Sequence, residues 1–523
     1  MAASLRCVRC READAALAVR EAAYCRTCYA RVFDGKVRAS LDLARGAILW
    51  HSVVRTMPPP TPPALAVSFD ARLPSCVLLH AVHRLLREAP GAGASHPVPA
   101  RAPEQARLDV LYVDDTCLVP GASDRSAEIQ ACVAALAPSA NLVRIPLHAA
   151  WGQDAQVPST LCTVTASGLP LQNAAPRAPA EALEALMAGL QQTSSKSESA
   201  AARTRVEDMH AILVRRVLCA TARARQCAAL LFAQDASDTA AHTLAAISKG
   251  AGHKLPVTGA ASLWIDDVLH VHPLRMHLPQ EVSFYAEEHG IQAVSVPTLF
   301  PPQPPAPAGA TYDTLADKTT LGRLADSLIV ALQQGVSSTS STVVGTLSKL
   351  VMLDTPLAPT VPPSVDVVPR IGAKGVALVR AAQGLPVWDP IRMRSCPLCR
   401  EPAQQGAADW KARTAMGAAL VPTRSDTDAI DLAPRACYAC LQVLDVPSGT
   451  TLPLPADVLS TTLQPEGAAM ALAAPPSAEA APDDSAAEMN AAMAVRHRPN
   501  ASHAAQRVSP DAMRAQVASF LLE

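Results

Sequence analysis

Eight of the fourteen cysteines stand in Cys-x2-Cys pairs, a spacing at which two thiolates reach the same metal ion. The pairs are Cys7 and Cys10, Cys25 and Cys28, Cys396 and Cys399, and Cys437 and Cys440. Because 14 residues separate the first two pairs and 37 the last two, each set can bring four thiolates to one tetrahedral Zn²⁺. We therefore predict two zinc sites. Buried cysteines without metal and redox-active pairs are the alternatives.

The N-terminal set lies in a segment, residues 1–50, that is too short to bury a large core. Metal ligation would supply its folding energy, about 10–16 kcal/mol in small zinc modules. Nine lysines and arginines against five acids fall in residues 1–45. This surplus indicates either a solvated face or a surface that contacts phosphate groups.

A second chemically suggestive stretch is a strand, loop and helix start between Ala64 and Val82. An apolar run to Val67 breaks at Ser68 and resumes at Ser75. A helix N-terminus with free backbone N–H groups binds anions, and phosphate loops use glycine to close round the ligand. The loop Phe69–Pro74 contains no glycine. Its position predicts a nucleotide loop, whereas its residues oppose one.

Further apolar runs of strand length lie at residues 108–115, 141–147 and 228–235. Each follows a helical or loop segment, which predicts βαβ units and an α/β fold with a parallel sheet. Asp114 and Asp115 would then lie at the carboxyl end of a strand, where such sheets bind ligands. Two acids that simply end a strand are the plainer interpretation.

Apolar residues at helical spacing from Val206 to Val217 predict a helix that carries several arginines. The arginines are Arg215, Arg216, Arg223 and Arg225. They indicate a solvated face or a surface that contacts the RNA backbone.

Shifts in composition, together with proline-rich and low-complexity stretches, predict seven segments along the chain. They are a zinc module (1–50), a proline-rich linker (51–63), the α/β domain (64–300), a linker with a helical extension (301–390), a second zinc module (391–445), a low-complexity disordered segment (446–508) and a terminal helix (509–523).

The net charge of −1 argues against a positive electrostatic potential over the whole protein, so any contact with RNA must come from local basic patches. No run of about 18 apolar residues is present, and the N-terminus lacks a secretory pattern. We expect a soluble cytoplasmic protein with reduced thiols and no membrane partner.

Several motifs, taken in their order along the chain, resemble those of the cytoplasmic tRNA 2-thiolation protein 2 family. They are CVRC, YCRTCY, FDGKVRASL, AVSFDARLPSCVLL, LYVDD, HPLRMHLPQEVSFY, SSTVVGTLSKL, CPLC, CYAC and FLLE. The resemblance runs from Cys7 to Leu522, apart from alanine-rich inserts. It implies a nucleotide-alpha-hydrolase-like domain of the ATP-pyrophosphatase-loop (PP-loop) superfamily, whose active members bind ATP at an SGGxxS-type loop, adenylate a tRNA carbonyl and replace oxygen by sulfur.

Carried over by position, Ser68 and Ser75 match the ends of that loop, and its glycine pair falls on Phe69 and Asp70. Phe69 adds a side chain, Asp70 adds a negative charge, and Pro74 removes an N–H donor. ATP binding is therefore doubtful. The six cysteines outside the pairs form no Cys-x2-Cys motif that would hold a catalytic iron–sulfur cluster.

The resemblance implies a catalytically degenerate subunit that forms a heterodimer with the cytoplasmic tRNA 2-thiolation protein 1 homologue. Together they would 2-thiolate the wobble uridine of tRNAs for Lys, Glu and Gln, giving 5-methoxycarbonylmethyl-2-thiouridine. The sulfur would come from the thiocarboxylate of a ubiquitin-related modifier, the same protein that is attached to targets in urmylation. The alternatives are an active ATP-dependent tRNA sulfurtransferase and a zinc-based interaction module unrelated to tRNA.

Overall fold

The fold is described from a computed structural model, in which two units divide the chain at Ala469/Met470. All described residues belong to the first unit. They are 6–19, 22–54, 64–87, 107–119, 121–152, 154, 156–166, 168–193, 198–265, 268–299, 317–350, 395–404, 406–414 and 430–463. The predicted terminal helix (509–523) and most of the proline-rich linker lie outside the described residues.

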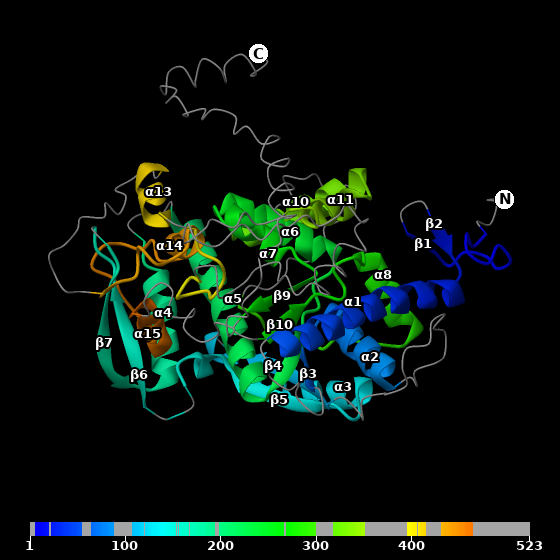
Figure 1. Cartoon of the computed structure of the whole chain (residues 1–523), viewed down its shortest axis with the longest axis horizontal. Coiled ribbons are helices and arrows are strands. Elements are labelled where there is room, and N and C mark those ends of the chain that lie inside the picture. Colours follow the sequence, from blue (N-terminus) through cyan, green and yellow to red (C-terminus); the bar gives the residue numbers. More distant parts are fainter. Residues whose placement is uncertain are drawn as a thin grey trace, which may run out of the picture. The chain divides into compact units, whose positions relative to one another are not determined.

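A six-stranded sheet of order β5-β4-β3-β8-β10-β9 forms the centre of the α/β domain (Figure 1). Its strands are β3 (Ala64–Phe69), β4 (Arg107–Asp114), β5 (Asn141–Pro146), β8 (Cys227–Leu231), β9 (Ser262–Ile265) and β10 (Val268–Val271). Every neighbouring pair is parallel except β9 with β10. The predicted α/β fold with a parallel sheet is confirmed.

Strand residues alternate between two cores because successive side chains point to opposite faces of a sheet. Val67 and Val110 face a core shared with α1, α2, α3 and α8, whereas Ala66 and Leu111 face α5. These helices are α1 (Arg26–Val54), α2 (Leu73–Arg87), α3 (Ser126–Leu136), α5 (Ser199–Ala224) and α8 (Pro279–Glu288). The sheet therefore has helices on both faces, as parallel sheets require.

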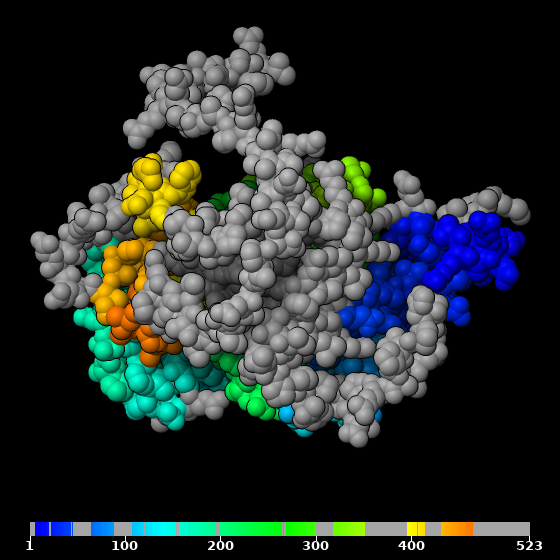
Figure 2. All heavy atoms as spheres, in the orientation of Figure 1, coloured from blue at the N-terminus to red at the C-terminus, as the bar shows by residue number. Residues whose placement is uncertain are grey.

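A four-stranded antiparallel sheet of order β11-β7-β6-β12 joins distant parts of the chain. Its strands are β6 (Val157–Thr163), β7 (Pro170–Arg177), β11 (Ile430–Asp431) and β12 (Thr451–Pro455). The helices α4 (Pro179–Leu190), α13 (Ala407–Thr414), α14 (Tyr438–Val443) and α15 (Ala456–Leu463) accompany it. In the space-filling view the yellow and orange C-terminal atoms lie against the cyan atoms of β6 and β7 (Figure 2).

This sheet corrects the predicted segment boundaries. Residues 451–463, part of the segment that we predicted to be disordered, form β12 and α15 because their apolar side chains join the core of the C-terminal module. The helix α1 runs past residue 50 to Val54, into the predicted linker.

The remaining elements surround these sheets. The hairpin strands β1 (Leu17–Val19) and β2 (Ala22–Tyr24) precede α1. The helices α6 (Ala236–Ser248), α7 (Leu255–Thr258), α10 (Leu321–Gly335) and α11 (Thr339–Leu347) and the short 3₁₀ turns η1 (Thr116–Leu118), η2 (Leu147–Ala150) and η4 (Gly252–Lys254) complete the described structure. The helices α10 and α11 pack on α6 through small alanine side chains and Ile329, and they lie in the segment 301–390 for which we predicted a linker and helical extension. None of the helices that the structure describes combines the length and apolarity that a bilayer crossing requires.

Candidate metal centres and a closed nucleotide loop

The four C-terminal cysteines converge on one point in the protein interior. Cys396 and Cys399 lie on a turn, and Cys437 and Cys440 lie at the start of α14. All four are buried, and their Sγ atoms lie within 4.8 Å of one another. The Sγ atoms of Cys399 and Cys437 are 3.8 Å apart. Thiolates about 2.3 Å from a tetrahedral Zn²⁺ lie about 3.8 Å apart, so this donor set fits a single zinc ion.

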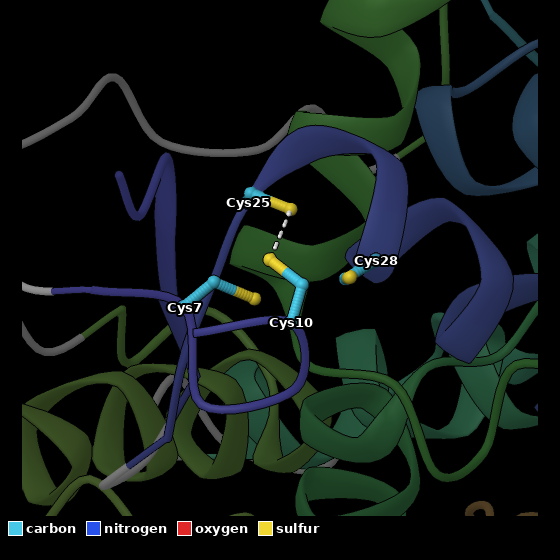
Figure 3. A group of neighbouring side chains, drawn as sticks. All are labelled: Cys7, Cys10, Cys25 and Cys28. Carbon is cyan, nitrogen blue, oxygen red and sulfur yellow. Dashed lines mark hydrogen bonds between the residues drawn. The ribbon is translucent and has the colours of Figure 1, made fainter. Parts of the chain in front are cut away.

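The N-terminal cysteines repeat this arrangement (Figure 3). Cys7 and Cys10 lie on a turn, Cys25 and Cys28 lie at the start of α1, and the Sγ atoms of Cys10 and Cys25 are 3.8 Å apart. The backbone N–H groups of Cys10 and Cys25 lower the pKa of Cys7 to about 6, which favours the thiolate that binds metal. Both groups are thus mononuclear sites in shape, since an iron–sulfur cluster would hold its thiolates farther apart.

The turn that carries Cys396 and Cys399 is tied to the α/β domain by a buried carboxylate. The side chain of Glu401 is 2% exposed and forms ion pairs with Arg215 of α5 and with Lys254. Lys254 also lies near the thiolates of Cys399 and Cys437, which raise its pKa. Because four thiolates around Zn²⁺ carry a net negative charge, Lys254 would stabilise the occupied centre.

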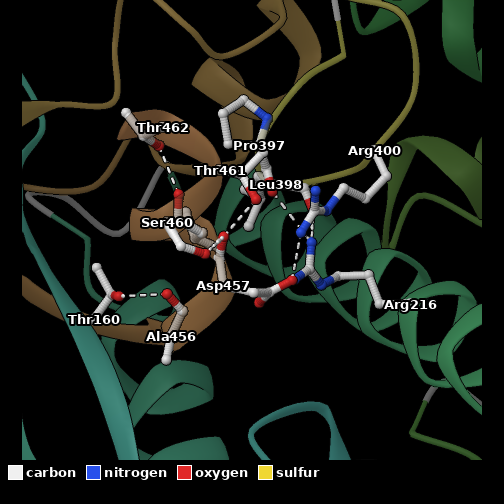
Figure 4. A network of polar contacts seen from close by, with 11 residues as sticks. Thr160, Arg216, Pro397, Leu398, Arg400, Ala456, Asp457, Ser460, Thr461 and Thr462 are labelled. Carbon is white, nitrogen blue, oxygen red and sulfur yellow. Dashed lines mark hydrogen bonds and ion pairs between the residues drawn. The ribbon is translucent and has the colours of Figure 1, made fainter. Parts of the chain in front are cut away.

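A second ionic contact joins the same elements (Figure 4). The Asp457 carboxylate of α15 pairs with Arg216 of α5 and with Arg400, whose nitrogen is 2.6 Å away. Arg216 also donates to the carbonyl of Leu398 at 2.8 Å. The turn, α5 and α15 are therefore held as one block.

These contacts change the interpretation of the α5 arginines. Arg215 and Arg216 bind carboxylates of the C-terminal module, and Arg225 binds the fully buried Asp109 at 2.7 Å. Arg223 also has an interaction partner. The guanidinium groups of Arg215, Arg216 and Arg225 are used within the chain, so the structure does not present them as a free phosphate-binding surface.

The loop at the end of β3 is closed by its own side chains. The Asp70 carboxylate accepts from the backbone N–H of Arg72 at 3.0 Å and from its guanidinium Nε at 2.7 Å. Ala71 adopts a φ of 63°, a conformation that glycine favours, and its carbonyl accepts from Val294 at 3.0 Å. Ser75 is buried, and its hydroxyl donates to the Arg72 carbonyl at 2.9 Å.

Two sequence-based expectations for this loop need correction. Ser68 lies within β3 rather than at the start of the loop. Phe69 is 2% exposed and packs in the core, so it does not fill the phosphate position. The chemical obstacles are Asp70, Arg72 and Pro74.

Carboxylates of α6 and α10 lie close enough to the loop to interact with the charge of Arg72. Asp70 raises the pKa of Arg72, and Asp238 of α6 and Asp326 of α10 add to this. Burial raises the pKa of Asp235, which caps α6, and of Asp326. A triphosphate placed here would face several carboxylates and one guanidinium that is already paired.

The raised pKa of Asp235 gives a stability prediction. Burial, then Asp238, raises it to about 7, above the ~3.9 of an unfolded chain. Because the folded state holds the proton more tightly, the free energy of unfolding should fall as pH rises from about 4 to 7, by on the order of 2 kcal/mol. Asp235→Asn should flatten this dependence in urea unfolding followed from pH 4 to 8. An exposed control, Asp154→Asn, should keep the wild-type slope. Identical slopes for both variants would contradict the prediction.

The other cysteines do not assemble a catalytic cluster. Within the described residues, the two four-cysteine groups are the only sets of histidine, cysteine and acidic residues close enough to share a metal. The Sγ atom of Cys219 lies 3.1 Å from Nε2 of the buried His270, and that of Cys76 lies 4.0 Å from Cys132. Cys117 is exposed, but burial, Asp114 and Asp115 raise its pKa and so disfavour the thiolate.

Sequence reasoning missed a polar pair at the carboxyl end of the sheet. His210 Nε2 lies 2.8 Å from the Asp115 carboxylate, whereas Asp114 accepts from Arg144 at 2.9 Å. The sequence placed Asp114 and Asp115 at the end of a strand. It gave no indication that His210 pairs with Asp115, because His210 lies 95 residues further along the chain, on α5.

No family model matches this chain. Proteins named cytoplasmic tRNA 2-thiolation protein 2 are similar to it. The one from Coccidioides immitis (strain RS) is 27% identical over 286 residues, covering 54% of this chain and 67% of the relative. The protein from Neosartorya fischeri is 26% identical, covering 54% of this chain and 68% of the relative. The protein from Aspergillus oryzae is 24% identical, covering 59% of this chain and 77% of the relative.

A solved structure, "U34-tRNA thiolase NcsA from Methanococcus maripaludis with its [4Fe-4S] cluster", is 12% identical to this chain. The TM-score is 0.41, with 66% of this chain and 86% of that chain covered. This likeness is too low to transfer any residue role.

Proposed function

We propose, from the confirmed resemblance to the cytoplasmic tRNA 2-thiolation protein 2 family, that this chain is a non-catalytic subunit in wobble-uridine 2-thiolation of tRNA. It works in the cytoplasm beside an active thiolase homologue, in a heterodimer. That partner binds ATP, and the ubiquitin-related modifier carries the sulfur as a thiocarboxylate. This chain holds two zinc ions, one at each cysteine group.

The closed loop at the end of β3 is the observation that carries the proposal. A phosphate loop presents several free backbone N–H groups to the ligand. Here Asp70 takes the N–H of Arg72, Pro74 has none, and the Cys76 N–H donates to the Arg72 carbonyl at 3.1 Å. Opening the loop would require breaking these bonds and placing a polyanion among carboxylates.

The alternative of an active tRNA sulfurtransferase is less well supported. Such an enzyme needs a nucleophilic thiolate or an iron–sulfur cluster near the nucleotide. Cys117 is the exposed thiol at the carboxyl end of the sheet, and its environment raises its pKa. An interaction module of interleaved zinc ligands is also disfavoured, since each cysteine group is complete within its own segment.

The test is thiolation of tRNA by the purified partner with and without this chain. We expect 2-thiouridine only when both are present. Ser68→Ala and Ser75→Ala in this chain should leave the rate within about twofold, because neither hydroxyl contacts a reacting phosphate. Calorimetry should detect no saturable Mg·ATP binding by the isolated chain.

Three outcomes would argue against this function. Tight Mg·ATP binding that Ser68→Ala abolishes would favour an active enzyme, as would loss of thiolation in Cys117→Ser. Normal 2-thiouridine in cells that lack the protein would favour a role unrelated to tRNA.

A further inference from the structure

A cleft of about 420 Å³ lies between the C-terminal ends of α2 and α3. It is lined by His80, His83, Arg84, Arg87, Ala135, Leu136 and Pro138. Because α2 starts at the carboxyl end of β3 and its C-terminal end lies away from that edge, this cleft lies at the side of the sheet opposite the closed loop. It is therefore separate from the site where sheets of this class bind nucleotides.

The positive charge of the cleft comes from its two arginines, because burial lowers the pKa of both imidazoles, that of His80 to about 4. Two imidazoles and two guanidinium groups line it, and none of its lining residues is acidic. Fixed partners hold three of these side chains: Arg84 pairs with Asp34 of α1, His83 Nε2 lies 2.9 Å from the Ser139 hydroxyl, and His80 Nδ1 lies 3.0 Å from the Tyr285 hydroxyl. The cleft is thus organised before any ligand arrives, which lowers the entropic cost of binding.

Arg87 is the exposed cation of this group. Within the described part of the chain it forms no ion pair with an acidic side chain, and it lies close enough to His83 to help lower the pKa of that imidazole. Arg84 and Arg87 do complement the dipole at the C-terminal end of α2. That effect accounts for cations on the last turn, but it does not account for His83 or for the absence of acids from the lining.

The opposite wall is apolar. Ala135, Leu136 and Pro138 come from the end of α3 and the turn that follows. A cleft that combines cationic donors with an apolar wall suits a ligand that has both a phosphate and a sugar or base. Its volume falls in the range of about 300–1,000 Å³ that is typical of small-ligand pockets and that accommodates one nucleotide unit.

We propose that this cleft binds one nucleotide unit of an RNA strand, with Arg87 on the phosphate. The assignment rests on the function proposed above. RNA is favoured over a free nucleotide because α1, which packs beside α2, carries a further exposed arginine, Arg31, whereas its Arg26 and Lys36 pair with acids of α8. The exposed Arg31 of α1 lies one turn from Asp34, the partner of Arg84. A strand leaving the cleft along α1 therefore meets further positive charge.

The test is tRNA binding by the full-length, zinc-loaded chain, measured by fluorescence anisotropy at several salt concentrations. Arg87→Glu should weaken binding at least tenfold, and Arg87→Ala several-fold, with a salt slope smaller by about 1. Arg87→Lys should retain most of the affinity, because a lysine keeps the charge. The matched control is Arg413→Ala, an exposed arginine of α13 that should bind like wild type.

Four outcomes would overturn the assignment. The first is Arg87→Glu binding tRNA like Arg413→Ala, and the second is a wild-type chain that does not bind tRNA at all. The third is an equal loss for Arg87→Lys and Arg87→Glu. The fourth is saturable binding of 5′-AMP that Arg87→Glu removes while tRNA binding persists, which would identify a free-nucleotide site. The thiolation assay judges the proposed function independently, since a subunit can support its partner without binding tRNA itself.

Discussion

On the proposal that each cysteine group holds one zinc ion, replacing Cys399 by alanine should lower the zinc content from two ions per chain to one and unfold the C-terminal module. Structural zinc contributes about 10–16 kcal/mol in small modules, so we expect a loss above about 5 kcal/mol here. Cys399 is buried among Cys396, Cys437 and Cys440, and within the described residues this group contains no fifth histidine, cysteine or acidic donor. The measurements are elemental analysis, thermal unfolding and the rate of proteolysis between residues 395 and 463.

The effect should spread beyond the turn because its core is shared. Leu398, Leu432 and Leu441 are fully buried in one cluster with Leu183 of α4 and Leu171 of β7. Losing the metal should therefore expose apolar side chains of residues 157–190 as well. Cys10→Ala should remove the other zinc ion and leave this region folded, and Cys117→Ala, at an exposed thiol, should change neither zinc content nor stability. Full zinc content in Cys399→Ala would contradict the metal site.

The central sheet was predictable because its signals are local. The strands β3, β4, β5 and β8 are short apolar runs, and each stands next to a helix with an apolar face. The two cysteine groups were predictable for the same reason, since the Cys-x2-Cys spacing by itself indicates a metal site.

The antiparallel sheet could not be predicted, because its signals are weak and distant. The strand β12 contains Pro453 and Pro455, and proline argues against a strand unless the strand is at an edge. β12 is an edge strand, and it pairs with β6, almost 300 residues earlier. The adjoining low-complexity sequence led us to assign the whole of 446–508 to disorder.

The pairing of Arg215 with Glu401 escaped prediction for a related reason. The two residues lie 186 positions apart, and a helix that carries several arginines has the same pattern whether they face solvent, RNA or a buried carboxylate. Likewise, the sequence identified the unfavourable loop chemistry of Asp70 and Pro74, but it could not show that the Phe69 ring points into the core.

Glu401→Ala should destabilise the chain by about 3–5 kcal/mol, the cost of leaving buried cations without their carboxylate. Glu401 is 2% exposed, Lys254 is 13% exposed and Arg215 is 26% exposed, so water cannot replace the lost partner fully. Urea unfolding monitored by tryptophan fluorescence measures the change.

The matched control is Glu128→Ala, which removes an exposed pair with Arg125 and should cost at most about 1 kcal/mol. The double variant Glu401→Ala/Arg215→Met should recover part of the loss, because it removes one stranded cation together with the carboxylate. This recovery separates the ionic contribution of Glu401 from its packing. A cost near that of Glu128→Ala, or no recovery in the double variant, would mean that the Arg216 contacts and the shared core, rather than Glu401, hold the module to α5.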